Sequence, residues 1–388
     1  MKKNLSNQIP KLVKKVLGAG VHRLHEPLFL GKEKIYLKNT INQNLVSSTG
    51  EYVNKFEEKI KKFTKSKFAV AVVNGTQAIY ISLKACGIKQ NEEVLVPALT
   101  FVGTVNAISY SGAKPHFVDS EINNFGIDCF KLENYLNKIT KFKNGKCMNK
   151  NTGRVISAIV PVHIFGHPCN IEKIIKISRK FNLIVIEDAA EALGSFYKKK
   201  HLGTFGDVGC ISFNGNKIIT TGGGGMVITN KKQIAKKIKH LTTTAKAKHK
   251  WEYIHDEIGY NFRMPNLNAA LGIAQLEKIH IFLKAKRILF KKYFEAFKRI
   301  QGVSVYEEPK NATSNYWLQT VVLKKNSISL RNKILEKLHK NLIYARPAWK
   351  LISELKPYKN SQKMNLSGAK EIYNRIINLP SSQSLIIK

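Results

Sequence analysis

One lysine stands where a reactive amine would be useful. Lys217 lies between the apolar run 208–213 and four consecutive glycines, Gly222 to Gly225. Glycines let the backbone pass close to a bound ligand. An amine held there, partly removed from water, loses its charge more easily and can form a Schiff base with an aldehyde. The alternative interpretation is a surface lysine in a flexible loop.

An acidic pair follows another apolar run. Glu187 and Asp188 end the segment 183–188, and open α/β sheets hold their ligands at that end of a strand. Asp188 can hold a protonated ring nitrogen or a metal, and it can equally cap a following helix. We expect no metal, because no second carboxylate or histidine stands nearby with ligand spacing.

The motif NGTQA (74–78) joins an expected strand to an expected helix. Gly75 allows a tight turn, and the free amides of Gly75, Thr76 and Gln77 point at whatever sits at the positive helix end. A phosphate suits that place, although an ordinary turn capped by Thr76 explains the motif equally well. Together, a phosphate seat, a carboxylate and an amine are the protein parts that pyridoxal 5′-phosphate (PLP) requires.

Short apolar strands alternate with helical segments from about residue 68 onward. The expected strands are 68–73, 93–97, 115–119, 155–163, 183–188, 208–213 and 225–230, and the expected helices are 77–86, 102–110, 171–181 and 231–240. Strands that are apolar throughout are typical of parallel sheets with helices on both faces. The pattern predicts an α/β fold with a large, doubly wound, mostly parallel sheet.

The pattern changes after residue 265. A long amphipathic helix is expected at 268–297, followed by strands at 303–308 and 316–323 and a helix at 329–339. We expect three parts: an N-terminal segment (1–24), a large PLP-binding domain (25–265) and a small C-terminal α+β domain (266–388) led by the connecting helix. The basic stretch 138–150 is interpreted as a solvated loop.

Composition narrows the class of protein but not its partner. The 388 residues carry 65 basic and 26 acidic side chains, a net charge of +39, spread along the chain. This charge suits nucleic acid, an anionic membrane or a phosphorylated substrate, and it selects none of them. Five irregularly spaced cysteines fit a reducing compartment. With neither a signal peptide nor a membrane-spanning segment expected, we predict a soluble cytoplasmic protein.

Seven segments together carry a family resemblance. They are NGTQA (74–78), PALTFVGTVNAI (97–108), PVHIFGHP (161–168), EDAAEALGS (187–195), LGTFGDVGCISF (202–213), NKIITTGGGGMV (216–227) and GYNFRMPNLNAALGIAQLEKI (259–279). In this order they resemble the DegT/DnrJ/StrS family of PLP-dependent sugar-nucleotide aminotransferases, and the resemblance covers nearly the whole chain. It implies fold type I of the PLP-dependent transferases.

Three further segments refine the resemblance. Residues 25–60, the lysine loop SFNGNKIITTGGGG (212–225) and ARPAWKLI (345–352) look most like the LegC-like branch. That branch aminates the 4-keto group of UDP-linked 4-keto-6-deoxy-N-acetylglucosamine-type sugars on routes to legionaminic acid or bacillosamine. The resemblance therefore implies glutamate as the amino donor and a UDP-linked, N-acetylated keto sugar as the acceptor.

The resemblance implies roles around the cofactor ring. Lys217 forms the Schiff base, Asp188 pairs with the pyridine nitrogen, and Phe101 stacks on the ring. Most members carry glutamine where this chain has Glu191, next to the phenolic oxygen. A carboxylate there would repel a phenolate unless one of the two is protonated.

The resemblance also implies a shared phosphate site. Gly75, Thr76 and Ser212 contact the phosphate, and Asn261 of GYNFRM corresponds to the asparagine that the partner subunit supplies in family homodimers. We interpret the polar stretch 249–255 as an active-site loop or, equally, as a solvated linker.

Substrate contacts are expected from scattered positions, namely His163, Arg263, Tyr316, Arg346 and Trp349. Two other functions stay open. In a sugar dehydratase of the same family histidine replaces the Schiff-base lysine, so Lys217 argues against it. A nucleic-acid-binding or regulatory protein would use the basic surface, but no recognised binding motif supports it. We expect a nucleotide sugar and glutamate as partners, with neither nucleic acid nor membrane, in cell-surface glycan or nonulosonic acid biosynthesis.

Overall fold

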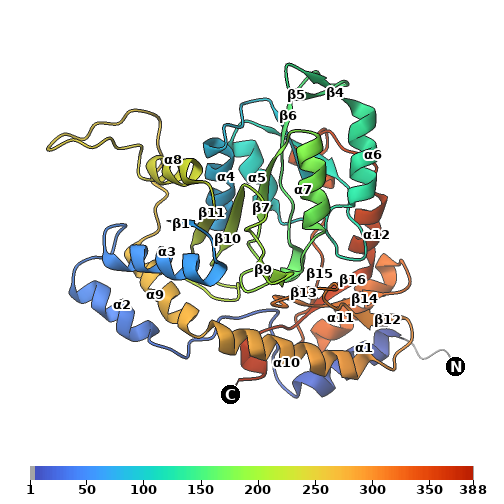
Figure 1. Cartoon of the computed structure of the whole chain (residues 1–388). Coiled ribbons are helices and arrows are strands. Elements are labelled where there is room, and N and C mark those ends of the chain that lie inside the picture. Colours follow the sequence, from blue (N-terminus) through green and yellow to red (C-terminus); the bar gives the residue numbers. More distant parts are fainter. Residues whose placement is uncertain (1–4, 388) are drawn as a thin grey trace.

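The computed structural model describes residues 5–387, with a seven-stranded sheet at its centre (Figure 1). In spatial order the strands are β1 (Phe68–Val72), β11 (Gly225–Thr229), β10 (Val208–Ser212), β7 (Ile184–Asp188), β6 (Ile156–Ile159), β2 (Glu93–Pro97) and β3 (Lys114–Val118). Within this sheet only β11 runs antiparallel to its neighbours. The other neighbouring pairs are parallel, so the predicted doubly wound α/β sheet is confirmed.

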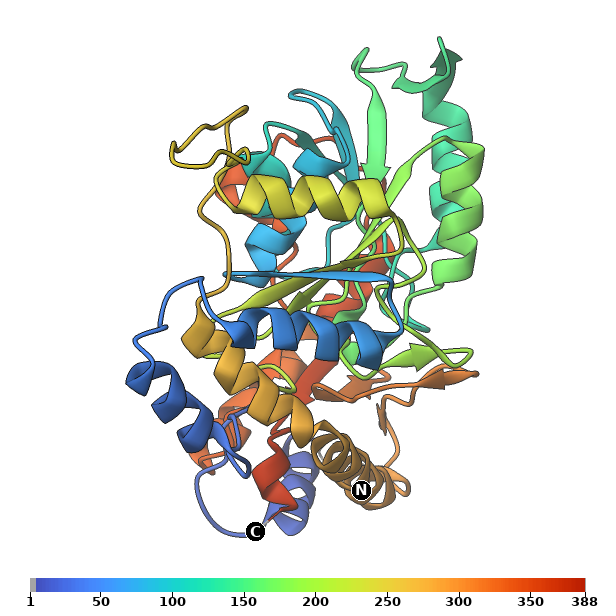
Figure 2. The ribbon, with the colours of Figure 1, turned by 60° about the vertical axis from the view of Figure 1, so that its left-hand side comes forward.

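Helices cover both faces of this sheet. One face packs against α4 (Gly75–Ala85), α5 (Val102–Tyr110) and α8 (Lys232–Thr242), and the other against α3 (Glu51–Thr64), α6 (Cys129–Ile139) and α7 (Ile171–Lys180). Val94 and Val96 of β2 contribute to the first layer, whereas Leu95 between them contributes to the second. Figure 2 shows α8 and α3 on either side of β1. The continuously apolar strands are thus explained, because both sides of each are buried.

A second sheet of four strands forms the small C-terminal unit. Its spatial order is β12 (Val303–Val305), β14 (Gln319–Leu323), β16 (Ile376–Leu379) and β15 (Arg346–Pro347), with α11 (Ile328–Lys340) and α12 (Ser367–Arg375) beside it. The N-terminal helix α1 (Leu5–Leu17) packs into this unit, since Ile9 and Val13 are buried among its apolar side chains. The described part of the N-terminal segment is therefore not separate, and the expected boundary at residue 266 stays a prediction.

The expected connecting helix is interrupted. Residues 268–297 form two helices, α9 (Asn266–Glu277) and α10 (Ile279–Phe297), joined at Lys278, whose ψ of 1° lies outside the helical range. The helix α9 packs against α3 and against α2 (Glu33–Asn42), whereas α10 packs against α1 and β12. The break lets each half follow a different unit of the fold.

The interpretation of 138–150 as a solvated loop is wrong. These residues hold the end of α6 and a hairpin of β4 (Thr140–Lys143) and β5 (Lys146–Asn149). Its turn is Asn144-Gly145, and both residues have positive φ, 50° and 71°. Asn-Gly favours such two-residue hairpin turns. The sequence therefore contained the hairpin signal, although the stretch is rich in lysine.

The remaining strands connect the two units. A three-stranded sheet contains β13 (Ala312–Thr313), β8 (Phe196–Tyr197) and β9 (Lys200–His201). It pairs a segment of the C-terminal unit with the chain that follows β7. Within 5–387, no helix has both the length and the apolar character needed to cross a membrane.

Candidate active site

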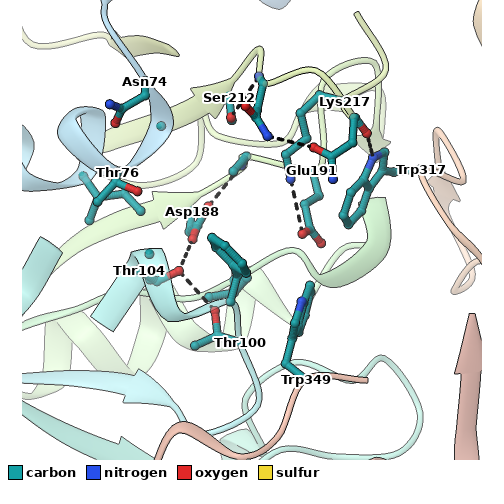
Figure 3. Close-up of a pocket in the computed structure, with 18 residues that line it drawn as sticks. Asn74, Thr76, Thr100, Thr104, Asp188, Glu191, Ser212, Lys217, Trp317 and Trp349 are labelled. Carbon is teal, nitrogen blue, oxygen red and sulfur yellow. Dashed lines mark hydrogen bonds and ion pairs between the residues drawn. The ribbon is translucent and has the colours of Figure 1, made fainter. Parts of the chain in front are cut away.

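A pocket of about 320 Å³ opens at the carboxyl ends of β7 and β10, beside the first turns of α4 and α5 (Figure 3). Because parallel strands end at the same edge, this is where such sheets hold ligands. The structure brings together many of the residues expected from the sequence. Gly75, Thr76, Phe101, Asp188, Glu191, Ser212, Lys217 and Trp349 all line the pocket.

Lys217 reaches the pocket from the turn after β10. Its backbone N–H donates to the carbonyl of Asn214 over 3.0 Å. The Nζ atom lies 4.0 Å from the centre of the Trp317 ring and 3.4 Å from Glu191 Oε1. Only 14% of the side chain is exposed, so this is not a surface lysine in a solvated loop. A partly desolvated amine of this kind can act as a nucleophile.

Asp188 ends β7 with both carboxylate oxygens oriented. The hydroxyl of Thr104 donates to Oδ2 over 2.6 Å, and the backbone N–H of Ala190 donates to Oδ1 over 3.0 Å. A turn rather than a helix follows the strand, so Asp188 is not the cap of a helix. Its carboxylate lines the pocket, where it can hold a protonated ring nitrogen.

The start of α4 forms an anion seat opposite Ser212. Asn74, and not Thr76, caps the helix: Asn74 Oδ1 accepts from the N–H of Gln77 over 2.8 Å. The N–H groups of Gly75 and Thr76 are in the first turn and have no acceptor within the helix. A Cβ atom on Gly75 would lie 2.8 Å from Ser212 Cβ, so only glycine allows this close approach. A phosphate suits the positive helix end.

These groups fit PLP. An amine, a carboxylate and a helix N-terminus face one pocket, and the exposed Phe101 ring stands at its wall. When bound, PLP supplies an aldehyde and an electron-accepting ring. Lys217 is placed to bind the aldehyde, Asp188 to hold the ring nitrogen and the start of α4 to hold the phosphate.

The sequence did not identify several side chains around Lys217. Trp317 comes from the segment before β14, and its indole N–H donates to the carbonyl of Asn216 over 2.6 Å. Its own carbonyl accepts from the fully buried Lys286 over 2.8 Å. From the C-terminal side, Gln383 Nε2 donates to the carbonyl of Ile218 over 2.9 Å. These contacts join distant parts of the chain, so no local spacing could have predicted them.

Two expected substrate contacts do not reach the pocket. His163 is fully buried, and its Nε2 lies 2.9 Å from Glu187 Oε2 outside the pocket lining. Tyr316 is 1% exposed, stacks on Phe290 and accepts from the N–H of Glu308. Because these side chains are covered and already paired, the structure does not support either one as a direct contact.

Three other expected residues lie outside the pocket lining but are accessible. Arg346 is exposed on β15, and Arg263 is half-buried with Nη2 3.5 Å from Asn54 Oδ1. Asn261 is exposed next to the projecting loop between α8 and α9 (Figure 1). Of the expected substrate residues, Trp349 alone lines the pocket, with its ring 6.3 Å from that of Phe101.

Known proteins resemble this chain over nearly its whole length. The model of the DegT/DnrJ/EryC1/StrS aminotransferase family matches residues 30–386. A GDP-perosamine synthase from Escherichia coli O157:H7 is 38% identical over 93% of this chain and 93% of its own. A UDP-4-amino-4,6-dideoxy-N-acetyl-beta-L-altrosamine transaminase from Campylobacter jejuni is 30% identical over 87% of each chain.

A solved structure agrees with this grouping. Helicobacter pylori PseC, an aminotransferase involved in the biosynthesis of pseudoaminic acid, superposes with a TM-score of 0.83 at 26% identity and covers 93% of this chain and 94% of its own. The family match, the relatives and the pocket agree on the chemistry. The chain belongs to the DegT/DnrJ/EryC1/StrS family and is a PLP-dependent sugar aminotransferase.

Proposed function

We propose that this protein transfers an amino group from glutamate to the 4-keto carbon of a nucleotide-linked 4-keto-6-deoxy sugar, for the biosynthesis of cell-surface glycans. The observation that carries the proposal is the placement of the Lys217 amine and the Asp188 carboxylate in one pocket. PLP needs both groups to move an amino group between two substrates. The sugar-nucleotide relatives support the acceptor class.

The nucleotide carrier separates two candidates. GDP-perosamine synthases from E. coli O157:H7 and Vibrio cholerae are 38% and 35% identical to this chain, which favours a GDP-linked sugar. The LegC-like assignment from the sequence favours a UDP-linked, N-acetylated sugar. The 30% identical Campylobacter transaminase supports this assignment, because it is named for a UDP-linked sugar. We place the GDP-linked sugar first and keep the UDP-linked sugar as the second candidate.

The test supplies both carriers to the same enzyme. PLP-loaded protein is incubated with glutamate and either the GDP-linked or the UDP-linked 4-keto-6-deoxy sugar, and products are followed by mass spectrometry. We expect one sugar to be aminated, with release of 2-oxoglutarate in equal amount. Amination of the UDP-linked sugar alone would favour the LegC-like branch. If neither sugar is aminated while 2-oxoglutarate still forms from glutamate, the acceptor class is wrong.

The accessible residues suggest which side chains hold the cofactor and which hold the sugar nucleotide. Gly75, Thr76 and Ser212 are proposed to hold the cofactor phosphate, and Trp349 to contact the sugar. Arg346, exposed on β15 two residues before Ala348, offers a charge for a diphosphate. Arg263 is a second candidate for that role.

We further propose a homodimer in which each subunit completes the other's pocket. Asn261 corresponds to the family's cross-subunit asparagine, yet it does not line the pocket of its own chain. The neighbouring loop projects from the molecule (Figure 1) and exposes large apolar side chains: Trp251 is 75%, Tyr253 77% and Ile258 84% exposed. Exposed apolar side chains of this kind favour cover by a second copy.

Mixed dimers test this arrangement. Lys217→Ala and Asn261→Ala chains are each expected to be inactive or severely impaired. In a mixed dimer, one pocket combines the intact Lys217 of one chain with the intact Asn261 of the other. Random pairing of equal amounts should therefore restore roughly a quarter of wild-type activity. Mixing Lys217→Ala with Asp188→Asn is the control, because both residues belong to the same pocket and no intact site can form. No recovery in the first mixture, or an active monomer by light scattering, contradicts the shared site.

A further inference from the structure

Glu191 lies in the pocket wall, and each of its two carboxylate oxygens has a partner. The side chain is buried, and the backbone N–H of Phe165 donates to Oε2 over 2.8 Å. The other oxygen, Oε1, lies 3.4 Å from Lys217 Nζ (Figure 3). With Oε2 bonded to the Phe165 amide, Oε1 is the oxygen that faces the amine.

Lys217 has one acid within ion-pair distance in the part of the chain that the structure describes, and that acid is Glu191. On another side its ammonium faces the Trp317 ring, which attracts a cation but cannot take a proton. Asp188 also lines the pocket, but its oxygens accept from Thr104 and Ala190. Glu191 is therefore the base placed beside the amine.

Charged groups on several elements of the fold act on Glu191 and Lys217. Burial raises the pKa of Glu191 to about 7; Lys217 and the Phe165 amide oppose this rise, and Asp188 adds to it. The charge of Lys217 also acts on His25. Burial and the charges of two lysines hold the pKa of His25 well below its usual value, so its imidazole is neutral. Glu191 consequently changes its protonation near neutral pH.

We propose that Glu191 is the proton acceptor that converts Lys217 from an ammonium into a nucleophilic amine. A proton moves from Lys217 Nζ to Glu191 Oε1, which leaves a neutral amine and a neutral carboxylic acid. The amine could then form a C–N bond to the carbonyl carbon of an aldehyde, and the carbonyl oxygen would leave as water with the proton from Glu191 and one proton from the nitrogen. Glu191 would return to its ionised form, and the nitrogen would keep one proton and the positive charge. Glutamine at this position could not do this. The proposal rests on the aldehyde cofactor of the family and not on the identity of the sugar.

This role determines how attachment of PLP to Lys217 depends on pH. Transfer within the pair leaves its net charge unchanged, so above the pKa of Glu191 the fraction of free amine does not depend on pH. Below that pKa Glu191 is already protonated, and the attachment rate should fall about tenfold per pH unit. Without the carboxylate, the amine must lose its proton to water. The rate should then rise about tenfold per pH unit throughout the neutral range.

Attachment of PLP to the full-length chain is a step that every new molecule undergoes once, and it can be followed by absorbance without any sugar. We expect the wild-type rate to be level above about pH 7 and to fall below it. Glu191→Gln should instead show a steady rise and be at least about tenfold slower at neutral pH. Its amide oxygen can still accept from the N–H of Phe165, so the site should keep its shape.

Two variants separate proton transfer from shape. Glu191→Asp keeps an acid and should keep the level region at a lower rate. Glu172→Gln removes an exposed carboxylate that pairs with Lys198 outside the pocket lining, and should match wild type. A small amine measured in the same buffers corrects for the ionisation of PLP itself. A level profile for Glu191→Gln, or a steady rise for wild type, overturns the proposal. If Glu191→Gln takes up no PLP, a steady rise for Glu191→Asp overturns it.

Discussion

Lys217→Ala is expected to abolish the covalent attachment of PLP and to lower transamination by at least on the order of 10³-fold. The reason is that one amine supplies both the link to the cofactor and the movement of protons at the reacting carbon. No other lysine lines the pocket that the structure describes. The loss should appear as a missing visible absorbance band and as the absence of a reducible adduct at this position.

A surface lysine provides the control for this change. Lys236 is exposed on α8, and Lys236→Ala should keep the absorbance band and the activity. If Lys217→Ala protein still turned over glutamate and a keto sugar at a comparable rate, the amine would have to come from elsewhere. Lys217 would then be only a structural neighbour of Trp317.

The second large effect is expected from Asp188→Asn, which should fold and bind PLP but react on the order of 10²-fold more slowly or worse. An amide cannot stabilise a positive charge on the ring nitrogen, so the ring becomes a poorer electron acceptor. The asparagine oxygen can still accept from the N–H of Ala190, and Thr104 can rotate to accept from the amide. The measurement is the single-turnover rate of the absorbance change after glutamate is added.

Thr104→Ala distinguishes charge from orientation. This variant keeps the carboxylate of Asp188 but removes the hydroxyl that donates to Oδ2. We expect a smaller loss than for Asp188→Asn, because the charge on the ring nitrogen is still matched. Equal losses in the two variants would mean that Asp188 acts mainly by holding the edge of the sheet in place.

The sequence predicted the site correctly where a functional residue lies at the end of a strand or just after it. Asp188 and Ser212 end the strands β7 and β10, and Gly75 opens α4 directly after β1. Each is therefore positioned by the sheet itself, whose mostly parallel, doubly wound class is predicted by the alternating apolar and helical segments. Lys217 is one short turn further on and was identified by the glycine run that follows it.

The sequence was less informative where distant segments meet. Trp317 reaches Lys217 from the C-terminal unit, and nothing in its local pattern indicates this contact. Tyr316 beside it is also buried but stacks on Phe290, so adjacent aromatic residues have different neighbours. The break at Lys278 escaped prediction as well, because tertiary packing and not a glycine or proline sets it.

The support of the Lys217 loop also has a consequence for the order in which the protein matures during synthesis. The strands that position Gly75, Asp188 and Ser212 are complete once the chain has been made through β11, which lies between β1 and β10 in the sheet, and domains generally fold as they emerge. The loop receives the Trp317 ring roughly a hundred residues later, and the bond from Gln383 to Ile218 spans 165 positions. A nascent chain can therefore offer PLP a phosphate seat well before its lysine is held in place. Early cofactor capture on the ribosome would be reversible, and the covalent link would form last.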